Sequence, residues 1–427
     1  MNAHSSSCPR LRILLSAYAC EPNKGSEPAV GWQSATTLAQ HHEVWVITRA
    51  NNRPTIERAL KQSPHPNLHF VYYDLPGWMS WWKRGGRGVQ LYYYLWQLLS
   101  ATRVRKLEAD QRFDVVHHVT IVRYWSPSNL RVSRAPFLWG PVGGGEDAPR
   151  SFRRSFAWRH RVIEQCRRWI RRLAELDPWV KQTAQAADIA LATTAETATR
   201  LRALGVARVE VMSQLGLDHM PTILQRSIEA ESSSQTLRFL CVGRWLYWKG
   251  FDLAIRAFAR MPFSEARLTV VGAGPESGRL KALARATSVA DRIDFREWLS
   301  PEETQAEMAA CDVLVHPSLH DSGGFVCLEA MAQGKPVVCL NLGGPALLVT
   351  HESGCKIDAA EPDQTVNSLA EAMQRLAEDR AQRHRMGQAS RSRVEQEFLW
   401  ARKIERWESL YSSLIDDATP AAETSNA

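Results

Sequence analysis

Short apolar runs alternate with longer amphipathic segments along most of this chain. The apolar runs are about four to eight residues long and lack a regular polar position, which is typical of parallel strands buried on both faces. The segments between them have helical periodicity and often end at Gly or Pro. The pattern predicts an α/β fold in which helices cover both faces of parallel sheets.

The predicted strands fall into two groups with a polar segment between them. In residues 1–220 they are Leu11–Tyr18, Val44–Thr48, Leu68–Tyr73, Asp114–His117, Pro136–Trp139, Asp188–Ala192 and Val209–Met212. In residues 237–395 they are Phe239–Val242, Leu268–Val271, Ile293–Phe295, Val313–Val315 and Val337–Leu340. Residues 221–236 have no strand pattern, so we interpret them as a linker between two domains. Residues 396–415 have a helical pattern, and residues 416–427 are predicted to be a disordered tail.

Composition supports a globular two-domain protein without choosing its activity. The 427 residues suit two α/β domains with separate cores, and 44% of them are hydrophobic. The eight cysteines form no Cys-x-x-Cys pair and are interpreted as core thiols of a reducing compartment. No run approaches the roughly 20 apolar residues that span a bilayer. Leu11–Cys20 could pass for a signal peptide, but Arg12 interrupts it, and a first strand explains it better.

Two carboxylates flank a glycine-rich helix start in the second group. Asp321 follows a strand pattern, Gly323 and Gly324 come next, and Glu329 lies a turn inside a predicted helix. A ligand can approach glycine backbone closely, and the first N–H groups of a helix favour an anion such as a diphosphate. A carboxylate at Glu329 can accept hydrogen bonds from the hydroxyls of a ribose. The simpler alternative is an acidic helix N-terminus with a solvated glutamate.

Two cations lie five residues apart in an earlier loop of the same group. Arg244 and Lys249 follow the strand pattern Phe239–Val242 and precede a helix with Gly250 near its start. Arg can fork onto phosphate oxygens, and Lys acts as a mobile point charge. The pair therefore suits a diphosphate leaving group, although each cation alone could be a surface charge.

These two elements resemble the donor motifs of the family 4 retaining glycosyltransferases. Two motifs show the resemblance. One is the Asp-x7-Glu spacing from Asp321 to Glu329, which continues as Glu-Ala-Met-Ala, and the other is Gly-Arg244 followed by Lys249-Gly. Asp321 is one methylene shorter than the glutamate that the family usually has. The resemblance implies the GT-B fold, with two Rossmann-like doubly wound domains that face a central cleft and a helix at 396–415 that crosses back to the first domain.

The resemblance also implies roles for individual residues. The loop after the first strand would face the donor diphosphate, and the turn at Gly274 would lie beside the base. The expected donor-binding residues are Gly25, Ser26, Arg244, Lys249, Gly274, Gly324, Phe325, Val326 and Glu329. The expected catalytic residues are His118, Arg244, Lys249 and Asp321. His117 is an alternative to His118, because the usual His-x-His spacing would place its second histidine at Val119.

The implied reaction transfers a sugar from a nucleotide diphosphate to an acceptor hydroxyl with retention at the anomeric carbon. No protein nucleophile stands out. The resemblance implies that the departing diphosphate itself receives the acceptor's proton on the same face, while the two cations and the helix N-terminus stabilise its charge. No Asp-x-Asp clamp lies near these elements, and we expect neither a cofactor nor an obligatory metal ion.

Other functions explain less of the pattern. Val270–Glu276 is an incomplete dinucleotide fingerprint, because residue 277 is Ser rather than Gly. A sugar-nucleotide epimerase of the same fold would need no separate acceptor. A nucleic-acid-binding protein would explain the net charge of +8 but neither donor motif, and we expect no nucleic-acid partner.

The acceptor is suggested by surface composition. Aromatic and cationic residues interleave at Gly77–Arg87 and Leu91–Leu99, and nine arginines lie between Arg150 and Arg172. Such segments are typical of proteins that lie on an anionic bilayer. We therefore expect a lipid-linked saccharide acceptor and a cytoplasmic enzyme, peripheral on the inner face of the cytoplasmic membrane. The alternative is a helix pair packed on a domain core with solvated arginines.

Overall fold

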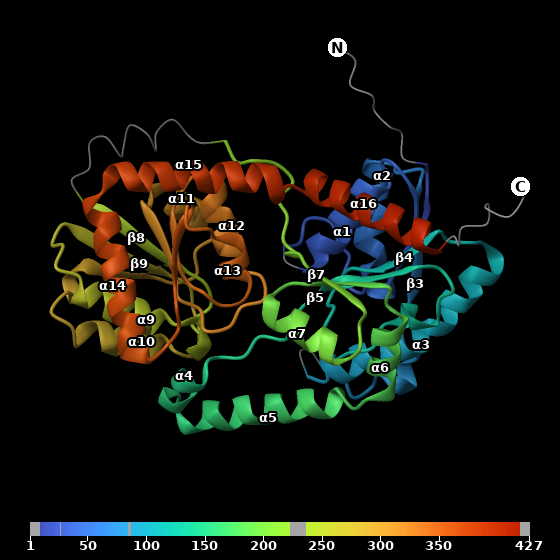
Figure 1. Ribbon diagram of the computed structural model, residues 1–427, viewed down its shortest axis with the longest axis horizontal. Coiled ribbons are helices and arrows are strands. Elements are labelled where there is room, and N and C mark those ends of the chain that lie inside the picture. The colour runs from blue at the N-terminus through green and yellow to red at the C-terminus, as the bar shows by residue number, and fades with distance from the viewer. Residues whose placement is uncertain (1–8, 26, 84–86, 223–235, 419–427) are drawn as a thin grey trace, which may run out of the picture. The chain divides into compact units, whose positions relative to one another are not determined.

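The computed structural model describes residues 9–25, 27–83, 87–222 and 236–418, which form two compact units (Figure 1). The first domain comprises Met1–Gly145, Ile170–Asp218 and Trp400–Ala427, and the second comprises Glu146–Trp169 and His219–Leu399. The prediction of one continuous domain over 1–220 is corrected here, because Glu146–Trp169 belongs to the second unit. Ala148, Phe152 and Phe156 from this segment are buried in the second domain's core.

The first domain has a seven-stranded parallel sheet in the order β3-β2-β1-β4-β5-β6-β7. The strands are β1 (Arg12–Ser16), β2 (Glu43–Arg49), β3 (Leu68–Tyr73), β4 (Val115–His118), β5 (Phe137–Val142), β6 (Ile189–Ala192) and β7 (Arg208–Val211). All seven overlap the predicted runs. Its helices are α1 (Glu27–Leu38), α2 (Arg53–Gln62), α3 (Val89–Asp110), α6 (Pro178–Ala186), α7 (Ala195–Ala203) and α16 (Trp400–Ala418). Short 3-10 turns are η1 (Ala50–Asn52), η2 (Gly77–Met79) and η3 (Asn129–Val132).

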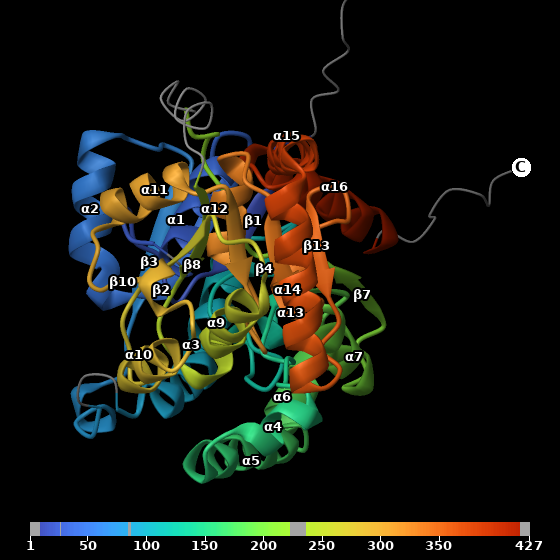
Figure 2. The ribbon, with the colours of Figure 1, turned by 90° about the vertical axis from the view of Figure 1, so that its left-hand side faces the viewer.

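The second domain has a six-stranded parallel sheet in the order β10-β9-β8-β11-β12-β13. The strands are β8 (Leu237–Val242), β9 (Ala266–Val271), β10 (Ile293–Arg296), β11 (Val313–His316), β12 (Val337–Leu340) and β13 (Gly354–Ile357). The sequence prediction missed β13, because this four-residue edge strand begins with Gly and contains Lys356. In Figure 2 it lies beside α14 (Pro362–Glu378) and α15 (Arg380–Glu397), which both contact it.

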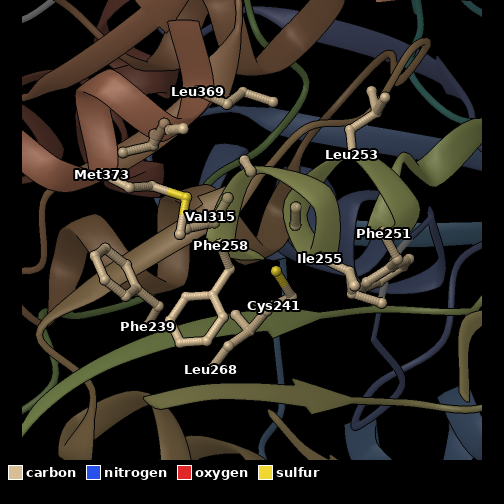
Figure 3. Packing of buried hydrophobic residues seen from close by; sticks show 14 of the residues in the cluster. Phe239, Cys241, Phe251, Leu253, Ile255, Phe258, Leu268, Val315, Leu369 and Met373 are labelled. Carbon is tan, nitrogen blue, oxygen red and sulfur yellow. The ribbon is translucent and has the colours of Figure 1, made fainter. Parts of the chain in front are cut away.

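The remaining helices of this domain are short apart from α5. They are α4 (Arg150–Ser155), α5 (Trp158–Ala174), α9 (Phe251–Arg260), α10 (Ser277–Arg285), α11 (Pro301–Ala310), α12 (Phe325–Ala332) and α13 (Gly343–Leu348), with the 3-10 turns η4 (Tyr247–Lys249) and η5 (Ala290–Arg292). The boundary between the two domains falls inside α5, after Trp169. In the core shown in Figure 3, Phe258 of α9 meets Phe239 of β8 edge to face, with ring centroids 6.3 Å apart.

The C-terminal helix α16 belongs to the first domain. Trp400, Ile404, Trp407, Tyr411 and Leu414 repeat at helical spacing, are all buried, and join that domain's core. The helical pattern therefore breaks between Glu397 and Trp400, so that α15 and α16 serve different cores. Residues 416–418, predicted to be tail, end α16, and 419–427 lie outside the described residues. Most of the predicted linker, 223–235, also lies outside them.

One of the two aromatic segments singled out for a membrane is part of a core. Tyr92, Tyr93 and Trp96 of α3 are buried in the first domain, which agrees with the packed-helix alternative. Trp78 and Trp81 before this helix are exposed. Within the described ranges, no helix is both long and apolar enough to cross a bilayer.

Candidate functional site

The donor motifs of the second domain meet where its strand order reverses. β8 and β11 are neighbours in the sheet although β9 and β10 come between them in sequence. Lys249 lies in the loop after β8, and Asp321 lies in the loop after β11. Because open α/β sheets bind ligands outside the carboxyl ends of strands at such a switch point, this edge is the candidate site.

Asp321 is the centre of a compact charged cluster. Its Oδ2 lies 2.5 Å from Lys249 Nζ and 3.3 Å from His316 Nε2. Its Oδ1 accepts hydrogen bonds from the backbone N–H groups of Gly323 and Gly324, each at 3.2 Å. The carboxylate thereby fixes both the lysine and the turn that enters α12.

The cluster strongly favours an ionised Asp321. Burial by itself would raise the pKa of this carboxyl group, but the hydrogen bond with His316 and the charge of Lys249 outweigh it and hold the pKa well below its usual range. For His316, burial lowers the pKa more than the hydrogen bond to Asp321 raises it. Asp321 is therefore an anion, and His316 is predominantly neutral at pH 7.

Backbone contacts hold the Lys249 loop against the Asp321 loop. The N–H group of Leu319 donates to the carbonyl of Trp248 at 2.8 Å. Gly250 has φ +67°, and a Cβ there would lie 2.0 Å from the carbonyl oxygen of Pro317. Only glycine permits both this conformation and this approach, which explains the Lys-Gly pair in the sequence.

Arg244 lies in a loop that contacts the turn at Ala273 and Gly274. Trp245 N–H donates to the carbonyl of Ala273 at 2.9 Å, and a Cβ at Gly274 would lie 2.4 Å from the carbonyl oxygen of Trp245. The Arg244 side chain is exposed and has no hydrogen-bond or ion-pair partner among the described residues. Gly274 thus contacts the loop that presents Arg244, a packing role that the sequence did not suggest.

Glu329 lies in the second turn of α12, and its side chain is partly buried. Its Oε1 accepts a hydrogen bond from Gln305 Nε2 at 2.9 Å. Gln305 comes from α11, whose first turn is closed by a capping box between Ser300 and Glu303. Burial raises the pKa of Glu329 to about 7, although the hydrogen bond from Gln305 opposes that rise. No sequence motif pointed to Gln305, because it lies 24 residues away on another helix.

Helix α12 begins at the cluster with unused backbone donors. Gly324, in the left-handed region, precedes Phe325 and Val326, whose N–H groups have no backbone acceptor among the described residues. Such first-turn donors attract anions because the helix dipole adds to their polarity. Two of the predicted donor-binding residues, Phe325 and Val326, therefore present backbone rather than side-chain chemistry here.

The first domain places its glycine loop at the corresponding switch point, between β1 and β4. Gly25 is exposed in the loop before α1, and Ser26 lies outside the described residues. Glu27, to which the sequence assigned no role, accepts a hydrogen bond from Ile121 N–H at 2.9 Å. Burial raises the pKa of Glu27, against the hydrogen bond from Ile121 and the charge of Arg123. This carboxyl group joins the loop after β1 to the loop after β4.

The two histidines of β4 point to opposite faces of the first sheet, as neighbours in a strand must. His117 is held at both ring nitrogens, by the Tyr411 hydroxyl and by the carbonyl of Gly140, each at 2.6 Å. His118 Nε2 lies 3.2 Å from Gln97 and 3.4 Å from the Tyr93 hydroxyl. Burial lowers the pKa of each to about 3.

Both histidines are therefore core residues. His117 and His118 are at most 1% exposed. The catalytic role predicted for His118 requires contact with a substrate, and its burial beneath α3 argues against that contact. The sequence could not show this, because Val115 and Val116 place an apolar side chain on each face of β4. The pattern therefore did not reveal whether either face was accessible to a substrate.

No group of three or more His, Cys, Asp or Glu side chains in the described ranges is arranged to hold a metal ion. Metal independence stays a prediction.

The second domain resembles a known family in sequence. A family model described as "Glycosyl transferases group 1" matches residues 226–393. D-inositol 3-phosphate glycosyltransferase of Corynebacterium diphtheriae is 33% identical over 189 residues, which cover 42% of this chain and 43% of that protein. GDP-mannose-dependent alpha-(1-6)-phosphatidylinositol monomannoside mannosyltransferase of Mycobacterium tuberculosis is 29% identical over 227 residues, which cover 51% and 52%. The chain thus spans about half the length of these curated relatives.

The fold is matched over a greater length. The crystal structure of HepE from Anabaena in complex with UDP superimposes with a TM-score of 0.60 at 17% identity, and the match covers 94% of this chain and 100% of that one. The two Rossmann-like domains of the present chain confirm the predicted α/β architecture of the GT-B type. The second domain of this chain is thus similar in sequence to the group 1 glycosyltransferases over residues 226–393.

Proposed function

We propose that the protein is a retaining glycosyltransferase that moves a sugar from a nucleotide-diphosphate donor to an acceptor hydroxyl. The observation that carries the proposal is the cluster of Lys249, Asp321 and the α12 N-terminus at the switch point of the second sheet. The names of two similar proteins support this donor class, since one uses GDP-mannose and the other was crystallised with UDP.

Each part of the cluster has a task toward a diphosphate. The ammonium group of Lys249 has three N–H donors, of which Asp321 occupies one, so the others can reach phosphate oxygens. Arg244 contributes an unpaired guanidinium from a pinned loop, and α12 contributes the N–H groups of Phe325 and Val326. Together they stabilise the negative charge that grows as the glycosidic bond breaks.

The state of Asp321 supports a mechanism without a protein nucleophile. Its two oxygens are already engaged by a lysine, a histidine and two backbone N–H groups, which lowers its basicity and fixes its position. A carboxylate held in this way is poorly suited to attack an anomeric carbon. The leaving diphosphate would instead receive the acceptor's proton on the same face, which gives retention.

Glu329 is proposed to accept hydrogen bonds from the ribose or the sugar of the donor. Its carboxyl group titrates near pH 7, since burial raises its pKa to about 7. Hydroxyl groups that donate to it would stabilise the ionised form, so the donor and the proton compete for this side chain.

The acceptor is proposed to be a lipid-linked saccharide in cell-surface polysaccharide synthesis, reached at the inner face of the cytoplasmic membrane. The mycobacterial relative is named for a phosphatidylinositol monomannoside, which is a lipid-linked saccharide. The exposed arginine- and tryptophan-rich segment of α5 also suits a membrane surface.

The test is donor binding followed by turnover. UDP-, GDP- and ADP-sugars are first screened by thermal shift, and release of the nucleoside diphosphate is then measured with a bacterial lipid extract. The variant Arg244→Ala/Lys249→Ala should lose both signals. Arg238→Ala is the matched control, because Arg238 is exposed at the opposite end of the same strand β8. Unchanged turnover in the double variant would refute the proposal, and an altered sugar nucleotide without any acceptor would indicate an epimerase instead.

A further inference from the structure

Helix α5 exposes a concentrated apolar surface. Of the 14 large hydrophobic side chains that are exposed in the described part of the chain, seven lie between residues 158 and 176: Trp158, Val162, Ile163, Trp169, Ile170, Leu173 and Leu176. Each is at least 47% exposed. Six of these seven residues belong to α5, and Leu176 follows it. Scattered exposed residues are ordinary, but such a concentration on one helix indicates an interaction surface.

The opposite face of α5 is held to the second domain by polar contacts. The ring of His160 stacks on Tyr247 with centroids 3.9 Å apart, and the Tyr247 hydroxyl donates to Glu164 at 2.7 Å. Arg167 donates to Glu164 at 2.9 Å. Because His160, Glu164 and Arg167 share one helical face, these contacts fix which side of α5 is turned outward.

The outward side has an apolar stripe with a basic border. At about 100° per residue, Trp158, Val162, Trp169 and Leu173 lie within about 60° of one another, opposite the anchored face. Arg161, Arg168 and Arg172 follow one another along one edge of the stripe. Arg161 and Arg172 are exposed, and Arg168 is partly exposed.

This arrangement is matched to one kind of partner. An anionic bilayer offers an apolar layer beneath a layer of negative headgroups, and it binds helices whose apolar stripe carries Trp and whose borders carry cations. We propose that the outer face of α5, defined by Trp158, Val162, Trp169 and Leu173 with Arg161, Arg168 and Arg172, docks on anionic phospholipid. The inference deepens the proposed function. It depends on that function only in explaining why the protein would bind a membrane, which is to bring the donor site to a lipid-linked acceptor.

The experiment is co-sedimentation of the full chain with vesicles of phosphatidylcholine alone or mixed with phosphatidylglycerol. The wild-type protein should sediment with the anionic vesicles, remain in the supernatant with neutral ones, and be released by high salt. Trp158→Ser/Trp169→Ser should lower the bound fraction by about tenfold or more, because the main apolar anchors are lost. Arg161→Gln/Arg168→Gln/Arg172→Gln should remove the preference for anionic lipid.

Trp298→Ser is the matched control, since Trp298 is 83% exposed but lies outside α5. Circular dichroism verifies that each variant is folded. Equal recovery of the wild-type protein in both supernatants would overturn the inference. So would a self-association that the tryptophan variants abolish, which would make α5 a contact between two copies of the chain.

Failure here can be told apart from failure of the proposed function. Thermal shift with sugar nucleotides is measured on the same preparations, and the α5 variants should keep that shift. A protein that binds donor but no vesicles retains the proposed transferase chemistry and loses the docking surface. A protein that binds vesicles but no donor loses the transferase assignment instead.

Discussion

Replacing Asp321 with Asn tests whether this carboxylate is the electrostatic centre of the site. Asn keeps the size of the side chain and one oxygen for the N–H groups of Gly323 and Gly324. It removes the negative charge beside Lys249 and can turn an N–H group toward the ammonium. The change therefore isolates the charge from the shape.

The expected cost follows from the burial of the pair. The side chains of Lys249 and Asp321 are 21% and 17% exposed. Removing one partner of a fully buried pair costs about 3–5 kcal/mol, and hydrogen bonds to charged groups contribute about 1.5–3 kcal/mol. Because some solvent reaches this pair, we expect Asp321→Asn to lower the free energy of unfolding of the second domain by about 2–4 kcal/mol.

The effect should depend on pH with a definite sign. The folded protein holds the pKa of Asp321 below its unfolded value of about 3.9, so the carboxylate stabilises the fold above that pH. This contribution is lost as the pH falls toward the folded pKa. The difference between wild type and Asp321→Asn should therefore be constant from pH 7 to about pH 5 and shrink below about pH 4.

The assay is urea unfolding followed by hydrogen–deuterium exchange of peptides from the second domain, since the two domains need not unfold together. A double-mutant cycle with Lys249→Met should give a coupling of about 1 kcal/mol or more. Asp294→Asn is the control: its partner Arg267 is 3.5 Å away, the two side chains are 45% and 51% exposed, and the cost should stay within about 1 kcal/mol. Additive effects of the two cluster variants, or a cost equal to that of Asp294→Asn, would refute the electrostatic role.

Three further predictions address other parts of the chain. Gly274→Ala should abolish donor binding in a folded protein, because the new Cβ would lie 2.4 Å from the carbonyl oxygen of Trp245 and displace the Arg244 loop. Gly278→Ala is the control: no atom lies within 4 Å of a Cβ at that position, so the donor thermal shift should stay intact. Donor affinity should rise as the pH increases through about 7, where Glu329 ionises. Glu329→Gln should remove this pH dependence when donor binding is titrated at pH 6 and pH 8. A variant whose donor affinity still rises with pH as in the wild type would contradict the role of Glu329. His117→Ala should loosen α16, because it removes the hydrogen bond with Tyr411 and an edge-to-face contact with Trp407. The expected cost in stability is about 2–4 kcal/mol, measured as faster proteolysis after Leu399. Resistance to proteolysis equal to that of the wild type would show that α16 packs on the first domain without His117.

Twelve of the thirteen strands could be placed from the sequence, because buried parallel strands are continuous apolar runs and show no competing helical period. The strand β13 escaped because it has a glycine and a lysine in only four residues. The segment Glu146–Trp169 was assigned to the wrong domain. Its Phe152 and Phe156 indicate burial in a hydrophobic core, but the sequence does not show which domain's core they join.

The fold class and the chemistry of the donor motifs were predictable from the sequence, because strand–helix alternation and the spacing of Arg244, Lys249, Asp321 and Glu329 are local properties of the chain. Which groups surround each of these residues depends on the three-dimensional fold. It joined Asp321 to His316 and Lys249, gave Glu329 its partner Gln305, used Gly274 to support the Arg244 loop, and buried both His117 and His118. The physical reason is that contacts between loops after different strands depend on sheet order, and the order in which β8 and β11 become neighbours is not encoded in either segment alone.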